Sequence, residues 1–102
     1  MIDLVRSRLE AIADLCRKHK VERLFLVGSA TGNGFDPGRS DVDFVVVFQP
    51  QERRGFDDVS FSLQHDLEEL LGRPVDLLEA HTLRNPYLIA SINRTKQMLY
   101  AA

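Results

Sequence analysis

Two aspartates one residue apart, Asp41 and Asp43, are the side chains whose spacing points most directly to chemistry. They open the apolar run 42–48, whose valines favour a β-strand. Because alternate side chains of a strand point to the same face, we expect the two carboxylates side by side. Neighbouring carboxylates repel each other, so a cation is expected between them, and oxygen ligands beside a phosphate site favour Mg²⁺.

A glycine-rich segment precedes the two aspartates. Gly28 and Ser29 follow directly after the apolar run 24–27, which is typical of a strand buried on both faces. A turn from such a strand presents backbone N–H groups and a serine hydroxyl to an anion, and glycine lets the backbone approach a ligand closely. The rest of the segment, up to Ser40, is expected to be a loop that Phe35 anchors to the core.

A third acid, Asp76, stands inside the apolar run 75–78, which predicts another strand. An ionised carboxylate buried in a strand is costly unless it is paired or bound to a metal. We therefore predict Asp76 as a third metal ligand beside Asp41 and Asp43. Phosphoryl and nucleotidyl transfer need this kind of centre, in which two metal ions about 4 Å apart neutralise the phosphates and align the attacking and leaving oxygens.

The spacing of apolar residues predicts the elements that carry these side chains. A stripe with steps of three and four predicts an N-terminal amphipathic helix capped by Asp3, with Ile2, Val5, Leu9, Ile12 and Cys16 as its members. A second stripe predicts a long helix that ends at Gly72, with Phe56, Val59, Leu63, Leu67 and Leu70 as its members. A third helix over 83–93, capped by Thr82, and an edge strand over 96–100 complete an α/β (α+β) fold.

Composition limits the class of protein. With 102 residues, of which 44% are hydrophobic and 27% charged, the chain 1–102 is expected to be a single globular domain. Thirteen basic side chains against fifteen acidic ones argue against nucleic acid as a direct partner. No apolar run reaches membrane-spanning length and no signal-peptide core is present, so no membrane partner is expected and the location is predicted to be cytoplasmic.

The order Gly28-Ser29, eleven intervening residues, Asp41-Val42-Asp43 and a later Asp76 resembles the signature of the polymerase-β-type nucleotidyltransferase superfamily. The closest resemblance is to its minimal nucleotidyltransferases, and it covers nearly the whole chain. The similar segments include 35–37, 39–41, 72–76, 85–88 and 99–100. An isolated Asp-x-Asp is more often a turn or a cap, whereas the combination is specific. The resemblance implies the nucleotidyltransferase fold, a small mixed β-sheet with helices packed on it.

The resemblance also implies roles for these residues. Asp41 and Asp43 would hold the Mg²⁺ ions, two of them, that carry the triphosphate of ATP, and Asp76 would complete the site of the catalytic metal and help deprotonate an attacking hydroxyl. Gly28 and Ser29 would hold the terminal phosphates. Many members carry Ala-Arg-Gly where this chain has Thr31-Gly32-Asn33, and Arg39 is the cation that could replace the missing arginine from across the loop.

Minimal nucleotidyltransferases are typically paired with a helical HEPN protein encoded beside them, as antitoxin and toxin. Some transfer AMP from ATP to a tyrosine of that partner, so the resemblance implies a Mg²⁺- and ATP-dependent protein adenylyltransferase. The alternative is a non-catalytic antitoxin that neutralises its partner by stoichiometric binding, which the missing arginine favours. Transfer to a small molecule such as an aminoglycoside is less expected, because the chain has no further domain to form its pocket. The small size predicts a site that another chain completes, in a homo- or hetero-oligomer.

Overall fold

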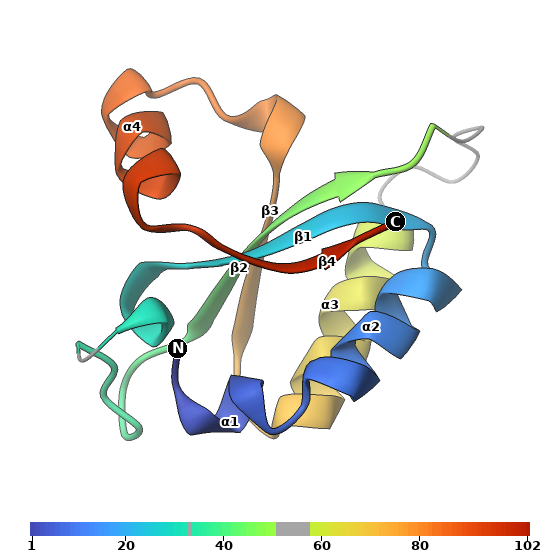
Figure 1. Ribbon diagram of the computed structural model, residues 1–102, viewed down its shortest axis with the longest axis horizontal. Coiled ribbons are helices and arrows are strands. Elements are labelled where there is room, and N and C mark those ends of the chain that lie inside the picture. The colour runs from blue at the N-terminus through green and yellow to red at the C-terminus, as the bar shows by residue number, and fades with distance from the viewer. Residues whose placement is uncertain (33, 51–57) are drawn as a thin grey trace.

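The computed structural model describes residues 1–32, 34–50 and 58–102 and contains a four-stranded mixed sheet between helices (Figure 1). The strand order is β3-β2-β1-β4, formed by β1 (Val21–Val27), β2 (Val42–Phe48), β3 (Val75–Glu79) and β4 (Gln97–Ala101). The central strand β1 is antiparallel to β2 and β4, whereas β2 and β3 are parallel. The predicted α/β class with a small mixed sheet is confirmed.

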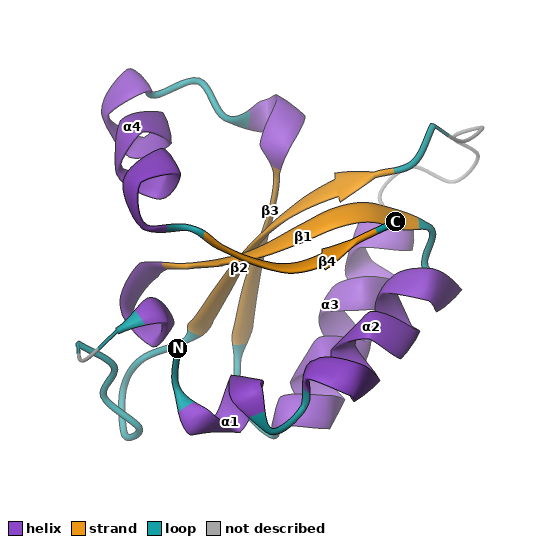
Figure 2. Cartoon of the chain, viewed as in Figure 1, coloured by secondary structure: helices purple, strands orange, loops and turns teal. Residues whose placement is uncertain are grey.

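Two helices, α2 (Leu9–Lys18) and α3 (Asp58–Leu71), cover one face of the sheet, as Figure 2 shows. Alternation along β1 and β2 sends every second apolar side chain to this face. The resulting core contains Ile12, Cys16, Leu24, Leu26, Phe44, Leu63 and Leu67, all fully buried. The members of both predicted helical stripes belong to this core or pack against it, except Val59, which is outside the core, and Phe56, which lies outside the described residues. Burial raises the pKa of the Cys16 thiol to about 12, as expected for a core residue.

The opposite face of the sheet carries the other set of alternating side chains. Phe25 and Val27 from β1 and Val45 from β2 form a smaller cluster there with Ile92 of α4 (Pro86–Thr95). Figure 1 shows α4 on the opposite side of the sheet from α2 and α3. Asp43 and Asp76 belong to this second face, because they alternate with the core residues Val42 and Phe44 in β2 and with the core residue Val75 in β3.

The predicted N-terminal helix is interrupted. It forms α1 (Asp3–Arg6) and then α2, with a turn at Ser7 and Arg8 between them. The Ser7 hydroxyl donates a hydrogen bond to the Leu4 carbonyl at 3.2 Å, a local bond that competes with continuation of the helix. The predicted cap was also wrong: Asp3 lies in the first turn, and Ile2 occupies the cap position without a side-chain bond.

The last helix begins three residues later than expected. Asn85, rather than Thr82, is its cap, because the Asn85 side-chain oxygen accepts hydrogen bonds from the backbone N–H groups of Tyr87 and Leu88. Pro86 takes the first helical position, where its missing N–H costs nothing. Thr82 instead lies in a short 3₁₀ turn, η2 (Ala80–Thr82). None of the helices described is both long and apolar enough to cross a membrane.

Candidate active site

The three predicted acids lie at the same end of the sheet. The parallel register of β2 and β3 places Asp43 directly opposite Asp76. On the other side of Asp43, its antiparallel partner is Val27, the last residue of β1, so Gly28 follows beside the carboxylate. Asp41 lies just before β2. Sheet topology therefore brings together residues that are separated by up to about fifty positions in the chain.

Carboxylates of like charge lie near one another at this end of the sheet. Burial raises the pKa of the Asp43 carboxyl, and the neighbouring carboxylates of Asp76 and then Asp41 raise it further. Burial and both neighbouring carboxylates all disfavour the negative charge of Asp43. A cation bound here would relieve this repulsion, so the sequence-based expectation of a cation between the acids has a physical basis in the fold.

One premise of the sequence argument was wrong. Asp76 was predicted as a carboxylate buried in an apolar strand, but its side chain is exposed. The reason is that β3 is an edge strand, and its second face is open where Asp76 lies. The desolvation cost falls on Asp43 instead, which is half-buried in the interior strand β2. Asp41 is exposed as well.

Gly28 adopts a backbone conformation that the site requires. Its φ is +72°, in the left-handed region, and a Cβ placed on it would lie 2.6 Å from Oδ2 of Asp43. The close approach of this glycine to a ligand stays a prediction; the structure shows instead the close approach of a carboxylate of the chain itself. The absent Cβ leaves a small cradle in which the Asp43 carboxylate sits against the backbone.

The carboxylates at this end of the sheet fit a magnesium ion that also binds ligands from outside the chain. Among the residues that the structure describes, no three acidic, histidine or cysteine side chains stand close enough to enclose an ion on their own. Mg²⁺ is typically held by one or two carboxylates, with phosphate oxygens and waters completing its octahedron. Asp43 and its register partner Asp76, with Asp41 beside them, match this open arrangement and do not match a closed cage.

The predicted phosphate-binding turn after β1 is a 3₁₀ turn, η1 (Gly28–Thr31). Within it the Thr31 hydroxyl donates to the Gly28 carbonyl at 2.7 Å, which keeps the turn closed. The Ser29 hydroxyl makes no hydrogen bond to any of the described residues, so it is available to a ligand. Its role as a phosphate ligand stays a prediction.

Arg39 lies in the loop that leads to Asp41. Its side chain is exposed and forms no hydrogen bond or ion pair within the described parts of the chain, so its predicted role toward phosphate also stays a prediction. Sequence reasoning gave no role to Arg73, whose guanidinium contacts this same loop through the carbonyls of Pro37 and Ser40. The hints in the sequence were its position three residues before Asp76 and its place in the similar segment 72–76.

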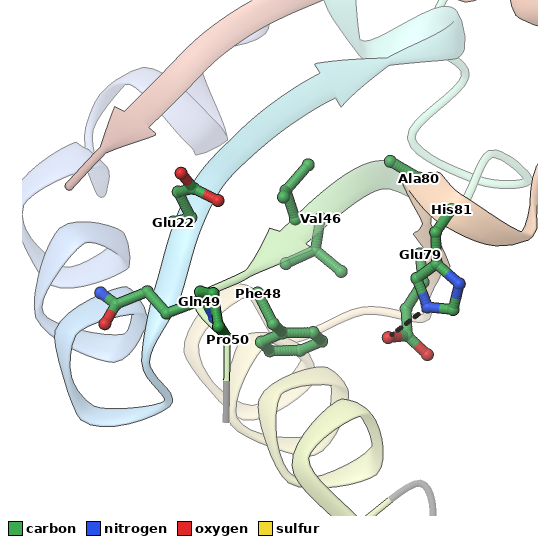
Figure 3. Close-up of a pocket in the computed structure, with 9 residues that line it drawn as sticks. Glu22, Val46, Phe48, Gln49, Pro50, Glu79, Ala80 and His81 are labelled. Carbon is green, nitrogen blue, oxygen red and sulfur yellow. Dashed lines mark hydrogen bonds and ion pairs between the residues drawn. The ribbon is translucent and has the colours of Figure 1, made fainter. Parts of the chain in front are cut away.

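A separate hollow lies at the other end of the strands. Figure 3 shows this cavity of about 310 Å³, lined by residues that include Glu22, Phe48, Gln49, Glu79 and His81. His81 Nε2 and Glu79 Oε1 are 3.2 Å apart, side by side at one edge of it. None of the site residues predicted from the sequence lines this cavity, so the candidate active site is the end of the sheet where the aspartates meet.

Comparisons with known proteins bear on this site. The family model of the nucleotidyltransferase domain matches residues 9–99. A curated relative from Methanocaldococcus jannaschii, named "Putative protein adenylyltransferase", is 32% identical over 90 residues, which cover 88% of this chain and 85% of the relative. A solved structure described as a "putative minimal nucleotidyltransferase" is 31% identical with a TM-score of 0.76, and the match covers 94% of this chain and 95% of that one.

A more distant structure shares the fold. It is a complex of a tri-AMPylated HEPN toxin with an MNT antitoxin from Shewanella oneidensis, and the match is 18% identical with a TM-score of 0.66. It covers 95% of this chain and 72% of the other. Because the family model and a relative above 30% identity each cover most of the sequence, the chain belongs to the nucleotidyltransferase domain family, as one of its minimal nucleotidyltransferases.

Proposed function

We propose that this chain uses Mg²⁺ and ATP to transfer AMP to a hydroxyl of a partner protein, a tyrosine of a HEPN-type toxin, and thereby acts as the antitoxin. The observation that carries the proposal is the register of Asp43 with Asp76 beside Gly28, where neighbouring carboxylates raise the pKa of Asp43. Two comparisons support the transfer of AMP to a partner protein. The curated relative is named "Putative protein adenylyltransferase", and the Shewanella structure pairs an MNT antitoxin with an AMP-modified HEPN toxin.

Each acid has a separate task in this proposal. Asp41 and Asp43 hold the metal-bound triphosphate, and Ser29 and Arg39 bind its terminal phosphates. Asp76 is exposed on the edge strand, where an incoming hydroxyl reaches it, and it assists removal of the hydroxyl proton. The hydroxyl oxygen then bonds to the α-phosphorus while the bond to the β-phosphate breaks and pyrophosphate leaves. Magnesium, when bound, supplies neutralisation of the phosphate charge.

The second face of the sheet provides room for the partner. The Tyr87 and Leu88 side chains of α4 are 85% and 43% exposed, and a cavity of about 280 Å³ lies between α4 and the sheet, over Phe25 and Val45. Because Asp41 and Asp76 are exposed, water reaches the acids in the isolated chain. Another chain docked on this face would exclude water and complete the wall around the nucleotide.

The test combines the purified protein with a HEPN-type protein encoded beside it, Mg²⁺ and α-labelled ATP. We expect label on the partner, lost with EDTA and reduced at least about 100-fold by Asp43→Asn or Asp76→Asn. Asp14→Asn is the matched control, because Asp14 is an exposed aspartate of α2 paired with Arg17, and it should label normally. A wild-type protein that never labels the partner would refute the enzymatic proposal.

A second candidate function is neutralisation by stoichiometric binding. It is favoured by the open acid set and by the absence of an arginine at Thr31 and Gly32. The double variant Asp41→Asn with Asp43→Asn separates the two functions. If this variant still neutralises the toxin, binding is sufficient; if neutralisation is lost while the complex persists on a sizing column, chemistry is required.

A further inference from the structure

The loop that leads to Asp41 is held in place by Arg73. Arg73 lies in the turn between α3 and β3, and its guanidinium donates one hydrogen bond to the Ser40 carbonyl at 3.3 Å and another to the Pro37 carbonyl. The guanidinium carbon also lies 5.1 Å from the centre of the Phe35 ring. One side chain therefore contacts the loop at its start, its middle and its end.

The loop itself is a closed turn that would move as a unit. The Asp36 carboxylate accepts a hydrogen bond from the Gly38 N–H at 2.9 Å, and the Asp36 carbonyl accepts from the Arg39 and Ser40 N–H groups at 3.0 and 2.7 Å. The Ser40 hydroxyl accepts in turn from the Asp36 N–H at 2.9 Å. Holding two carbonyls of such a turn therefore also holds Arg39 inside it and Asp41 directly after it.

Among the described residues, only Arg73 forms hydrogen bonds that join this turn to another part of the chain. A hollow of about 540 Å³ lies beside it, lined by Ile2, Leu4, Phe35, Pro37, Leu71 and Arg73. Of the loop side chains, the half-buried Phe35 packs against the core, whereas Asp36, Pro37 and Arg39 are exposed. Arginine suits the task, because its planar fork of donors bridges two carbonyls while stacking on a ring, whereas lysine offers a single point charge.

The sheet positions two of the three acids but not the third. The ladder between β2 and β3 starts at Val42, whose N–H bonds to the Pro74 carbonyl at 3.1 Å, and it sets Asp43 against Asp76. Asp41 precedes this ladder. We propose that Arg73 is a positioning residue that fixes Asp41 relative to Asp43 and Asp76, and with it Arg39. The part of this inference that concerns a metal ion rests on the proposed function.

Amide hydrogen exchange on the metal-free full chain tests whether Arg73 holds the loop. Arg73→Met should speed exchange of the Arg39 and Ser40 amides by about tenfold, with Arg73→Lys in between. Arg84→Met is the matched control, because Arg84 also bonds two backbone carbonyls, those of His81 and Leu83, but at the other end of β3; it should leave these amides unchanged. Unchanged exchange in Arg73→Met would overturn the inference.

A double-mutant cycle on Mn²⁺ affinity tests whether Arg73 acts through Asp41. Arg73→Met should weaken Mn²⁺ binding by roughly tenfold in the wild-type background and by less than about twofold in the Asp41→Asn background. An equal loss in both backgrounds would overturn the positioning role, because the effect would then come from the fold in general. A wild-type protein that binds no Mn²⁺ would refute the proposed metal-dependent function instead, while the exchange result would still decide whether Arg73 holds the loop.

Discussion

Two aspartates of this fold, Asp43 and Asp66, have opposite electrostatic surroundings. Burial and two neighbouring carboxylates raise the pKa of Asp43. The pKa of Asp66 is lowered, first by a hydrogen bond with His19 and then by one from Lys18, at 2.7 and 3.0 Å. The contrast separates an acid whose negative charge is stabilised by side chains of the protein from one whose negative charge is disfavoured by its surroundings.

The cause of the difference lies in the elements that surround each acid. Lys18 and His19 lie at the C-terminal end of α2, where the charge of Lys18 complements the helix dipole, and α3 packs against α2 so that Asp66 contacts both residues. Asp66 thereby joins two helices of the scaffold. At Asp43 the sheet register brings a further acid, Asp76, and none of the described residues lowers the pKa of Asp43.

The largest expected effect is the difference between replacing Asp43 and replacing Asp66 by asparagine. Asp43→Asn should weaken Mg²⁺ or Mn²⁺ binding at least about 100-fold. In EDTA it should raise Tm by about 2–5 °C, because it removes an uncompensated charge. Asp66→Asn should lower Tm and leave metal affinity within about twofold, because it removes only the link between helices. Thermal denaturation measures Tm and metal titration measures the affinity of both variants. Tm shifts of the same sign would contradict the opposite electrostatic surroundings of Asp43 and Asp66.

A second prediction concerns the cradle around Asp43. Gly28 and Gly72 have similar left-handed φ values, +72° and +69°, so alanine costs about 1–2 kcal/mol of strain at either position. Only at Gly28 would the new Cβ meet Asp43 Oδ2, at 2.6 Å, because nothing lies within 4 Å of the position at Gly72. Gly28→Ala should therefore lower Tm further than Gly72→Ala and weaken metal binding about tenfold. Equal effects of the two variants would mean that Asp43 does not depend on the cradle.

The smallest expected effect is the pH dependence of stability. The lowered folded-state pKa of Asp66 gives stability that is complete above the unfolded-state pKa, near 4, and is lost as the pH falls through the folded value. The raised pKa of Asp43 acts in the opposite sense, because metal-free stability falls as the pH rises from about 4 through its folded value. Tm profiles of wild type, Asp43→Asn and Asp66→Asn in EDTA from about pH 3 to 7 measure these slopes. Parallel profiles for all three proteins would contradict the assignment.

The sequence by itself determined the local elements and the identity of the acids. Continuous apolar runs predicted the strands around 24–27 and 42–48, and steps of three and four predicted the helical faces that pack on the sheet. These predictions succeeded because periodicity within a strand or helix is a local property. The same local patterns also predicted that Asp43 lies near the start of its strand, after the Gly-Ser turn and its loop.

Only the tertiary structure decided how far each acid is exposed to solvent and which residues hold it in place. Asp76 was expected to be buried, but strand order makes β3 an edge, and strand order depends on pairing between distant segments. Asp66 and its two partners, His19 and Lys18, are 47 and 48 residues apart, and Arg73 reaches carbonyls 33 and 36 residues away. No local pattern encodes such contacts, because they form only when packing brings separate elements together.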